Sequence, residues 1–304
     1  MKSAIVTGGN GFIGRRMVKK LQSNQVEVTA IDIYHDEDVI ANRGKEKLLK
    51  VDYSNLQEAY DKIPESVDVL YHFAWNGVSA NQRNNFDVQL VNINMSFNVM
   101  KMAHLKKVKK VILLGSASEF ANSNMTIKGK NIASPIEAYG AVKYASNLIN
   151  TMYASLNGIE CIGTIITSVY GPGRDDNNIL SYAIKTMLNG EAPSFTPLEQ
   201  RWDFLYISDL LEALFLIGLR GKSEKTYAVG SGVSKPMKEY IEIIRDAIDP
   251  SIILNIGKHP YKAGKPDNSI FNIEELSNDT GFAPNYRFER GIKKVISYFK
   301  SVNI

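Results

Sequence analysis

The strongest constraint on this chain is a glycine-rich turn near its N-terminus. Residues 5–14 read IVTGGNGFIG, an apolar run that breaks into glycines and continues as the helical pattern Phe12–Leu21. In such a turn Gly8 permits a tight strand-to-helix reversal, Gly11 lets bare backbone approach a pyrophosphate, and Gly14 permits close helix–strand packing. The helix N-terminus presents unpaired N–H groups to the anion. The segment predicts a phosphate-binding turn, with an ordinary strand-to-helix turn as the alternative.

An acidic residue ends the second predicted strand. Asp32 follows the apolar run Val26–Ile31, close to where an acidic side chain meets the adenosine ribose of a dinucleotide. A carboxylate there accepts hydrogen bonds from a free 2′-hydroxyl and repels a 2′-phosphate. No arginine follows at once, because the next residues are Ile33, Tyr34 and His35. Asp32 therefore favours NAD over NADP, and the alternative is a solvated aspartate in a loop.

Composition agrees with a soluble enzyme of 304 residues. The sequence has no run of 18 or more apolar residues that would predict a membrane span. The predicted first strand starts too early to leave room for a signal peptide. We therefore expect a cytoplasmic protein with no membrane partner. The single Cys161 excludes an intrachain disulfide framework and a cysteine-cluster metal site. The four histidines lack metal-ligand spacing, so no metal is expected.

The small formal charge of +4 argues against a nucleic-acid partner. Its lysine clusters, at 45–50 and 106–110, lack interleaved aromatic residues, and we interpret them as solvated surface.

Strand-like runs alternate with amphipathic stretches along most of the chain. This alternation predicts an α/β fold of the Rossmann type, a doubly wound parallel sheet covered by helices on both faces. The expected strands are Ala4–Thr7, Val26–Ile31, Lys47–Val51, Val67–Phe73, Val111–Leu114 and Cys161–Thr167, and we expect Asp203–Ile207 and Thr226–Val229 to rejoin the sheet. We assign residues 1–170 and about 201–232 to a cofactor-binding domain. Residues of about 171–200 and 233–304 form a smaller substrate lobe, with helices such as Lys238–Ala247.

A second informative segment reads AYGAVK, inside a predicted helix of about Pro135–Tyr153. Tyr139 and Lys143 are four apart and share one helix face, so the ammonium can lie beneath the phenol and reach a bound ribose. Lowering a phenol pKa of about 10 by three units requires roughly 4 kcal/mol, which a nearby lysine and a charged nicotinamide could supply. Ser116 ends the strand-like run Val111–Leu114, where its hydroxyl can bond both the phenol and a substrate oxygen. The alternative is a surface Tyr–Lys pair.

Taken together, these motifs resemble the extended short-chain dehydrogenase/reductases, and most closely their nucleotide-sugar epimerase/dehydratase branch. The matching segments, in order, are TGGNGFIG, Asp32, Asp52 in LLKVDYSN, YHFAW, Asn92 in VNINMSFN, LGSASEF, YGAVK, VYGPG, EQRWDFLYISDLLEA and DTGFAPNYRFERGI. The resemblance implies NAD as cofactor and Ser116, Tyr139 and Lys143 as the catalytic triad.

The resemblance also implies further cofactor contacts. It assigns Asp52 to the adenine amino group, Phe73 and Ala74 to the cofactor wall, and Asn92 to a supporting hydrogen bond near the active site. The remaining expected contacts are the glycines of the turn with Phe12 and Ile13, and Tyr53, Tyr139 and Lys143. The alternatives are a turn residue at Asp52 and a helix-surface amide at Asn92.

Departures from the family pattern narrow the chemistry. Sugar-nucleotide 4,6-dehydratases carry an Asp-Glu pair directly after the catalytic hydroxyl, because eliminating water needs a second acid and base. Those positions here are Ala117 and Ser118, which disfavours dehydration.

The expected substrate contacts also depart from that pattern. The usual Arg and Asn before V-Y-G-P are Ile165 and Ser168, and Trp202 follows Arg201 where the family has an Arg-Asp pair. The substrate candidates are Ser118, Ser168, Arg201 and Lys265.

These residues predict an NAD-dependent epimerase that acts on a nucleoside-diphosphate sugar at C4 through a transient 4-keto intermediate. One alternative is a 4-ketoreductase that makes a deoxysugar nucleotide, similar to abequose synthase, and a minor one is a non-catalytic NAD-binding sensor or scaffold. The family commonly pairs subunits through the helices of about Val88–Leu105 and Pro135–Tyr153, so a homodimer is expected.

Overall fold

A seven-stranded parallel sheet organises the chain. The computed structural model describes residues 1–33, 47–120, 126–127, 130–131, 133–174, 178–260 and 272–302. The strand order is β12-β8-β5-β4-β1-β2-β3, and every pairing is parallel. The strands are β1 (Ser3–Thr7), β2 (Glu27–Asp32), β3 (Lys47–Lys50), β4 (Val69–His72), β5 (Lys110–Ser116), β8 (Glu160–Ile166) and β12 (Thr226–Val229). The predicted Rossmann-type sheet is confirmed.

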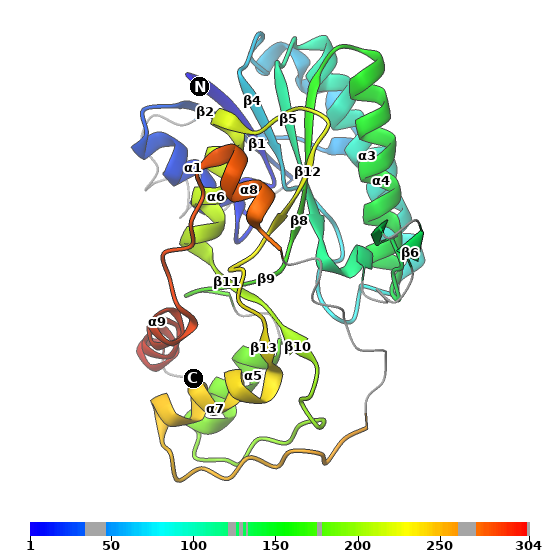
Figure 1. Ribbon diagram of the computed structural model, residues 1–304. Coiled ribbons are helices and arrows are strands. Elements are labelled where there is room, and N and C mark those ends of the chain that lie inside the picture. Colours follow the sequence, from blue (N-terminus) through cyan, green and yellow to red (C-terminus); the bar gives the residue numbers. More distant parts are fainter. Residues whose placement is uncertain are drawn as a thin grey trace.

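Helices cover both faces of this sheet (Figure 1). In β1, Ala4 and Val6 belong to one apolar cluster with residues of α1 (Gly14–Ser23) and α6 (Ile207–Arg220). Ile5, between them, belongs to a second cluster with residues of the long helices on the opposite face, α3 (Phe86–Leu105) and α4 (Ala138–Leu156). Because side chains alternate between faces, a strand covered on both sides reads as a continuous apolar run.

Short elements connect the strands. Helix η1 (Tyr53–Lys62) precedes β4, η2 (Ala117–Phe120) follows β5, and β6 (Thr126–Ile127) pairs with β7 (Lys130–Asn131). Helix α4 begins at Ala138, later than predicted, because Glu137 has an extended backbone with φ −133° and ψ 149°.

The prediction that Asp203–Ile207 rejoins the large sheet is wrong. Strand β11 (Phe204–Tyr206) pairs instead with β9 (Ser168–Tyr170) in a separate two-stranded sheet. The chain leaves β8 after Ile166, and the Thr167 hydroxyl donates to the carbonyl of Asp203 at 2.5 Å, which ties the start of β11 to β9 rather than to the sheet edge. The prediction that Thr226–Val229 rejoins the sheet is confirmed, and this strand, β12, takes the edge position beside β8.

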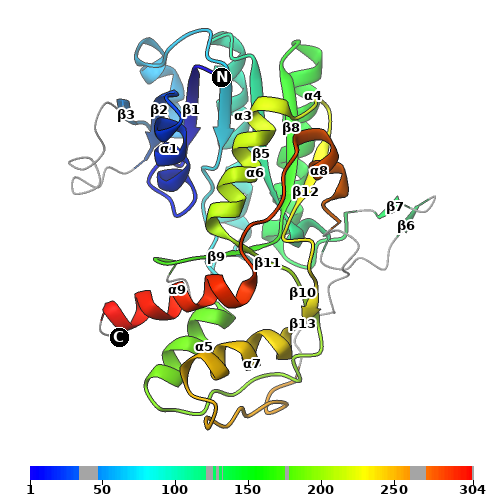
Figure 2. The ribbon, with the colours of Figure 1, turned by 60° about the vertical axis from the view of Figure 1, so that its left-hand side comes forward.

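A smaller group of helices lies beyond the carboxyl ends of the strands (Figures 1 and 2). It consists of α5 (Ile179–Leu188), α7 (Met237–Ile248) and α9 (Phe288–Ser301), with β10 (Arg201–Trp202) paired to β13 (Lys235–Pro236). One apolar cluster runs from Val6 in the sheet through Tyr206 to Ile241 in α7. The division into two domains therefore stays a prediction, since their cores are continuous.

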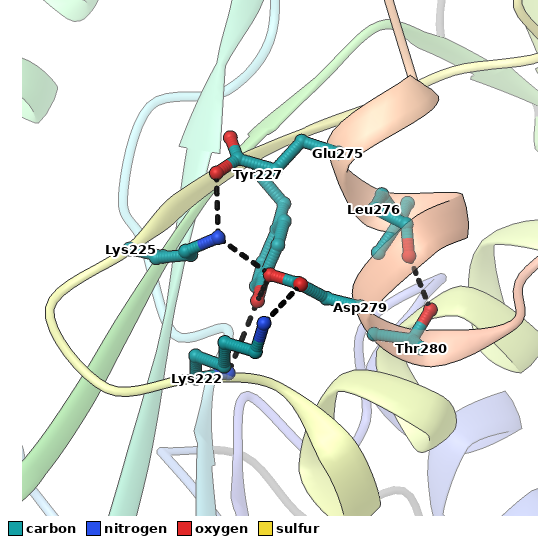
Figure 3. Close-up of polar contacts among 7 residues, drawn as sticks. All are labelled: Lys222, Lys225, Tyr227, Glu275, Leu276, Asp279 and Thr280. Atoms are coloured by element: carbon teal, nitrogen blue, oxygen red, sulfur yellow. Dashed lines mark hydrogen bonds and ion pairs between the residues drawn. The ribbon is translucent and has the colours of Figure 1, made fainter.

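One C-terminal helix lies with the sheet rather than with that group. Helix α8 (Glu274–Thr280) packs on α6 and β12 and is held by an ion-pair cluster (Figure 3). The Asp279 carboxylate pairs with Lys222 at 2.5 Å and Lys225 at 2.7 Å and accepts the Tyr227 hydroxyl at 2.8 Å. These donors hold the pKa of Asp279 below its usual range. The cluster anchors the chain where it crosses back over the sheet.

Candidate active site

The glycine-rich turn lies between β1 and α1 as the sequence predicts. Gly8 has a positive φ of 68°, and a Cβ there would lie 2.8 Å from the Ala74 nitrogen, so the position accepts only glycine. The Gly11 amide donates to the Gly8 carbonyl at 3.0 Å, and α1 begins at Gly14. Phe12 and Ile13 therefore precede the helix N-terminus, where backbone N–H groups favour an anion.

Asp32 ends β2 beside this turn. Its carboxylate accepts the backbone N–H of Asn10 at 2.8 Å and of Ile33 at 2.8 Å, and the residue is 9% exposed. These bonds fix the carboxylate against the turn. Tyr34 and His35 lie outside the described residues.

Asp52 and Tyr53 open helix η1 with different environments. The exposed Asp52 side chain accepts the amide of Ser54 at 2.8 Å and its hydroxyl at 2.7 Å, and these bonds lower the pKa of Asp52. The Tyr53 phenol is buried, donates to the Ile31 carbonyl at 2.8 Å and accepts the Gly8 amide at 3.0 Å. Its hydroxyl thus links the glycine turn at Gly8 to the end of β2 at Ile31.

A buried polar chain supports the segment after β4. The Thr7 hydroxyl accepts the amides of Phe73 at 3.1 Å and Ala74 at 3.3 Å and lies 2.8 Å from Nδ1 of His72. The other imidazole nitrogen lies 2.8 Å from the Ser96 hydroxyl in α3. Burial lowers the pKa of His72 to about 3, so the ring is neutral and structural.

Asn92 fixes the backbone of the same segment. Its side-chain carbonyl accepts the Asn76 amide at 2.8 Å, and its NH₂ group donates to the carbonyls of Asn76, Val88 and Gln89. Asn92 is fully buried on the inner side of α3. It shapes the chain that leads from Ala74 toward the catalytic candidates.

Ser116 and Tyr139 meet at the carboxyl end of β5. Ser116 is the last residue of that strand, its hydroxyl accepts the Ser118 amide at 3.2 Å, and its side chain acts to lower the pKa of the Tyr139 phenol. This approach needs Gly140, where a Cβ would lie 2.3 Å from the Ser118 carbonyl oxygen. The glycine after Tyr139 therefore lets the first turn of α4 close on η2.

Lys143 lies one turn further along α4 and is 6% exposed. Its ammonium is 3.7 Å from the ring centroid of Trp75 and 5.8 Å from that of Tyr139. Burial lowers the pKa of Lys143, and the charge of the buried Glu119 opposes this shift. Burial likewise raises the pKa of Glu119, whose carboxylate accepts the Ser116 amide at 2.7 Å. A phenol, an ammonium and a hydroxyl so grouped can exchange a proton with a bound alcohol.

The predicted substrate residues occupy different places. The Ser118 hydroxyl accepts a hydrogen bond from Arg83 at 2.5 Å, close to Tyr139. Ser168 begins β9, opposite Phe204 in the two-stranded sheet. Arg201 is exposed on β10, with its guanidinium bonded to the Ser234 carbonyl, and Lys265 lies outside the described residues.

Sequence reasoning missed four residues that surround Tyr139. Trp75 packs its ring edge-on to the phenol with centroids 6.1 Å apart, and Arg83 packs on the phenol ring. Glu119 and Arg174 act on the same phenol through their charges. Glu119 could have been found as a carboxyl close to Ser116 in LGSASEF, whereas nothing in the sequence links the other three to Tyr139.

No helix of the described chain is long and apolar enough to cross a membrane. Within the same residues no group of three His, Cys, Asp or Glu side chains is arranged to hold a metal ion.

Comparison with known proteins gives concordant matches. The sequence model of the NAD dependent epimerase/dehydratase family matches residues 4–230. The chain is 26% identical over 306 residues to CDP-abequose synthase of Salmonella typhimurium, covering 96% of each chain. It also resembles the structure of UDP-N-acetylglucosamine 4-epimerase from Methanobrevibacter ruminantium, with a TM-score of 0.86, 25% identity and 99% of each chain covered. UDP-glucose 4-epimerase from Thermotoga maritima has the same fold, with a TM-score of 0.86, 22% identity and 99% coverage of each chain.

Proposed function

Because this chain belongs to the NAD dependent epimerase/dehydratase family, we propose that it inverts C4 of a nucleoside-diphosphate sugar through a transient 4-keto intermediate. The observation that carries the proposal is the grouping of Ser116 and Tyr139 at the end of β5, with the buried Lys143 ammonium 5.8 Å from the centroid of the Tyr139 ring. These three residues come from two elements that only the fold brings together.

The expected cofactor, NAD, agrees with this family. The glycine turn fits this cofactor, because Gly8 packs closely against the backbone of Ala74 and the turn leads into a helix N-terminus. Asp32 is fixed at the end of β2, where an adenosine ribose would lie. When bound, NAD supplies a hydride acceptor and donor for C4. We propose that the contacts expected from the sequence at Asp52, Phe73 and Ala74 complete this site.

In the proposed reaction Tyr139 is the proton acceptor for the 4-hydroxyl. Ser116 holds the sugar oxygen and the phenol in one hydrogen-bonded group, and Lys143 stabilises the phenolate through its charge. The 4-keto sugar then turns over, and Tyr139 returns the proton to the oxygen on the other face. A neutral phenol is a poor base at neutral pH, so the charges around Tyr139 decide whether the step proceeds.

Dehydration is not proposed. Ala117 has no acid or base, and the Ser118 hydroxyl is occupied by Arg83. The carboxyl of Glu119 is 1% exposed and accepts the Ser116 amide, so it faces the protein interior. We infer that its role is to hold the end of β5 and balance the charge of Lys143.

A one-way 4-ketoreductase is the second candidate. It is favoured by the 26% identity to CDP-abequose synthase over nearly the whole chain. The non-catalytic sensor or scaffold is disfavoured because Tyr139 and Lys143 are both present and close together.

One experiment separates these candidates. The purified protein is incubated with a panel of nucleoside-diphosphate hexoses, and with 4-keto-6-deoxysugar nucleotides plus reduced cofactor. Inversion at C4 without net consumption of NADH supports the epimerase. Stoichiometric oxidation of reduced cofactor with a 4-keto sugar supports the reductase, and neither change on the full panel would contradict both.

We also propose that the protein is a homodimer that pairs through α3 and α4. These two helices pack on each other, and both leave large apolar side chains exposed. Leu90, Leu148 and Met152 are 51%, 50% and 59% exposed. The other exposed apolar residues of the two helices are Phe86, Val91, Leu105, Tyr144, Ile149 and Leu156. An apolar surface of this kind on two adjacent helices is typical of a subunit interface.

A further inference from the structure

Arg83 lies against Tyr139 with both its main chain and its side chain. It belongs to the segment that joins β4 to α3, far from Tyr139 in the sequence. The centre of its guanidinium is 4.5 Å from the centroid of the Tyr139 ring, and its carbonyl accepts the Tyr139 amide at 2.9 Å. A cation at this distance over an aromatic face is attracted to the ring, and more strongly to a ring that carries a negative charge.

Two partners fix the guanidinium in this place. Its Nε lies 2.9 Å from Oε2 of Glu137, the residue directly before α4, and another of its nitrogens donates to the Ser118 hydroxyl at 2.5 Å. Side-chain exposure is 28% for Arg83 and 34% for Glu137, so the pair is only partly screened by water. Because Ser118 accepts from Arg83, its own proton is directed to another acceptor.

The charges that face Tyr139 come from four elements. Lys143 lies on its own helix, Glu119 on η2, Arg174 on the segment after β9, and Arg83 on the segment before α3. Burial raises the pKa of Tyr139, Arg83 is the largest opposing charge, and Glu119 adds to the increase. A buried phenol that must lose its proton therefore depends on the cations around it.

We propose that Arg83 is a positioning residue, a second cation held on the face of Tyr139 by Glu137 and Ser118, which favours the phenolate and fixes the ring for proton transfer. This role of Arg83 rests on the proposed function, because the Tyr139 phenolate matters only if Tyr139 transfers a proton. The contact itself does not depend on which sugar is turned over. Glu137 limits the effect, since its carboxylate offsets part of the guanidinium charge.

Two variants test the proposal because they break the same ion pair with opposite electrostatic results. Arg83→Met removes the cation and should raise the pKa of Tyr139 by about 0.5–1 unit, the size expected for one cation–π contact. Glu137→Gln removes the opposing carboxylate and should lower that pKa by about a few tenths of a unit. Arg83→Lys retains the charge without the planar stack and should fall between the wild type and Arg83→Met.

The measurement is an ultraviolet phenolate titration of NAD-loaded protein. Each spectrum is corrected with the same variant that also carries Tyr139→Phe, so that only the Tyr139 signal remains among the 15 tyrosines. Where turnover is found, the acid limb of its pH profile should move in the same direction as the titration.

Shifts of opposite sign for Arg83→Met and Glu137→Gln support the proposal. Shifts of the same sign, no shift, or a Tyr139 that stays protonated in every variant up to alkaline unfolding would overturn it and leave Arg83 a structural residue. If Arg83→Met does not fold, the comparison of Arg83→Lys with Glu137→Gln decides the same question. If no sugar is turned over, the proposed function fails while the titration still reports on Arg83.

Discussion

Discrimination between NAD and NADP tests the reasoning about Asp32 most directly. Its carboxylate is held by two backbone N–H groups and is 9% exposed, so it cannot turn away from a cofactor bound at the turn. Two unit charges about 4 Å apart repel by about 1 kcal/mol in bulk water and about 4 kcal/mol at an effective dielectric of about 20. Low exposure places Asp32 nearer the second value. Since 1.4 kcal/mol is a factor of ten, NADP(H) should bind at least about tenfold more weakly than NAD(H).

Calorimetric titration of cofactor-stripped protein measures both affinities. Asp32→Ser should reduce the discrimination to less than about tenfold and weaken NAD itself, because the ribose loses its acceptor. Asp52→Ser is the matched control. It removes an exposed carboxylate next to Tyr53, whose hydroxyl bonds the glycine turn, and it should leave the ratio of the NAD and NADP affinities unchanged. Equal or tighter binding of NADPH by the wild type would refute the reasoning and weaken the preference for an epimerase.

Three further outcomes are expected. Tyr139→Phe should lower turnover by a factor of ~10²–10⁴ or more, the usual contribution of a positioned base, with little change in fold or NAD affinity. Lys143→Met should lower turnover and also weaken NAD binding, as measured by calorimetry. Near-normal turnover of Tyr139→Phe would contradict the chemistry. Leu148→Asp should convert a dimer into a monomer, as measured by light scattering at micromolar concentration. The control Ile253→Asp is the same type of substitution at a residue that is 71% exposed and lies outside α3 and α4, and it should leave the dimer intact. A monomeric wild type would contradict the dimer. The buried His72 has a pKa of about 3, against about 6.5 in the unfolded chain. Its contribution to the free energy of unfolding is therefore fully present above pH 6.5, and it should fall by about 1.4 kcal/mol for each pH unit below 6.5. Urea unfolding of wild type and His72→Gln between pH 7 and 4 checks this, and parallel pH dependences would contradict it.

Much of the fold followed from local sequence pattern. Alternation of apolar runs with amphipathic stretches predicted the parallel sheet, because strands buried on both faces must be apolar at successive positions, as Ala4, Ile5 and Val6 are. The turn from Gly8 to Gly14 could be predicted because its requirements are local. Gly8 must adopt a positive φ, and a helix must begin at Gly14. The pairing of β11 could not, since a short apolar run carries no information about which edge it joins.

The sequence by itself determined the residue types of the site and their local spacing. Tyr139 and Lys143 share a helix face because they are four apart, and Ser116 ends a strand because the apolar run stops there. Only the tertiary structure decided which charges surround the phenol. Arg83, Glu119 and Arg174 reach Tyr139 from three separate segments, and no spacing rule connects segments whose distance is set by packing across a sheet. The identity of the proposed base is therefore set locally in the sequence, whereas the ease with which it loses a proton depends on the whole fold.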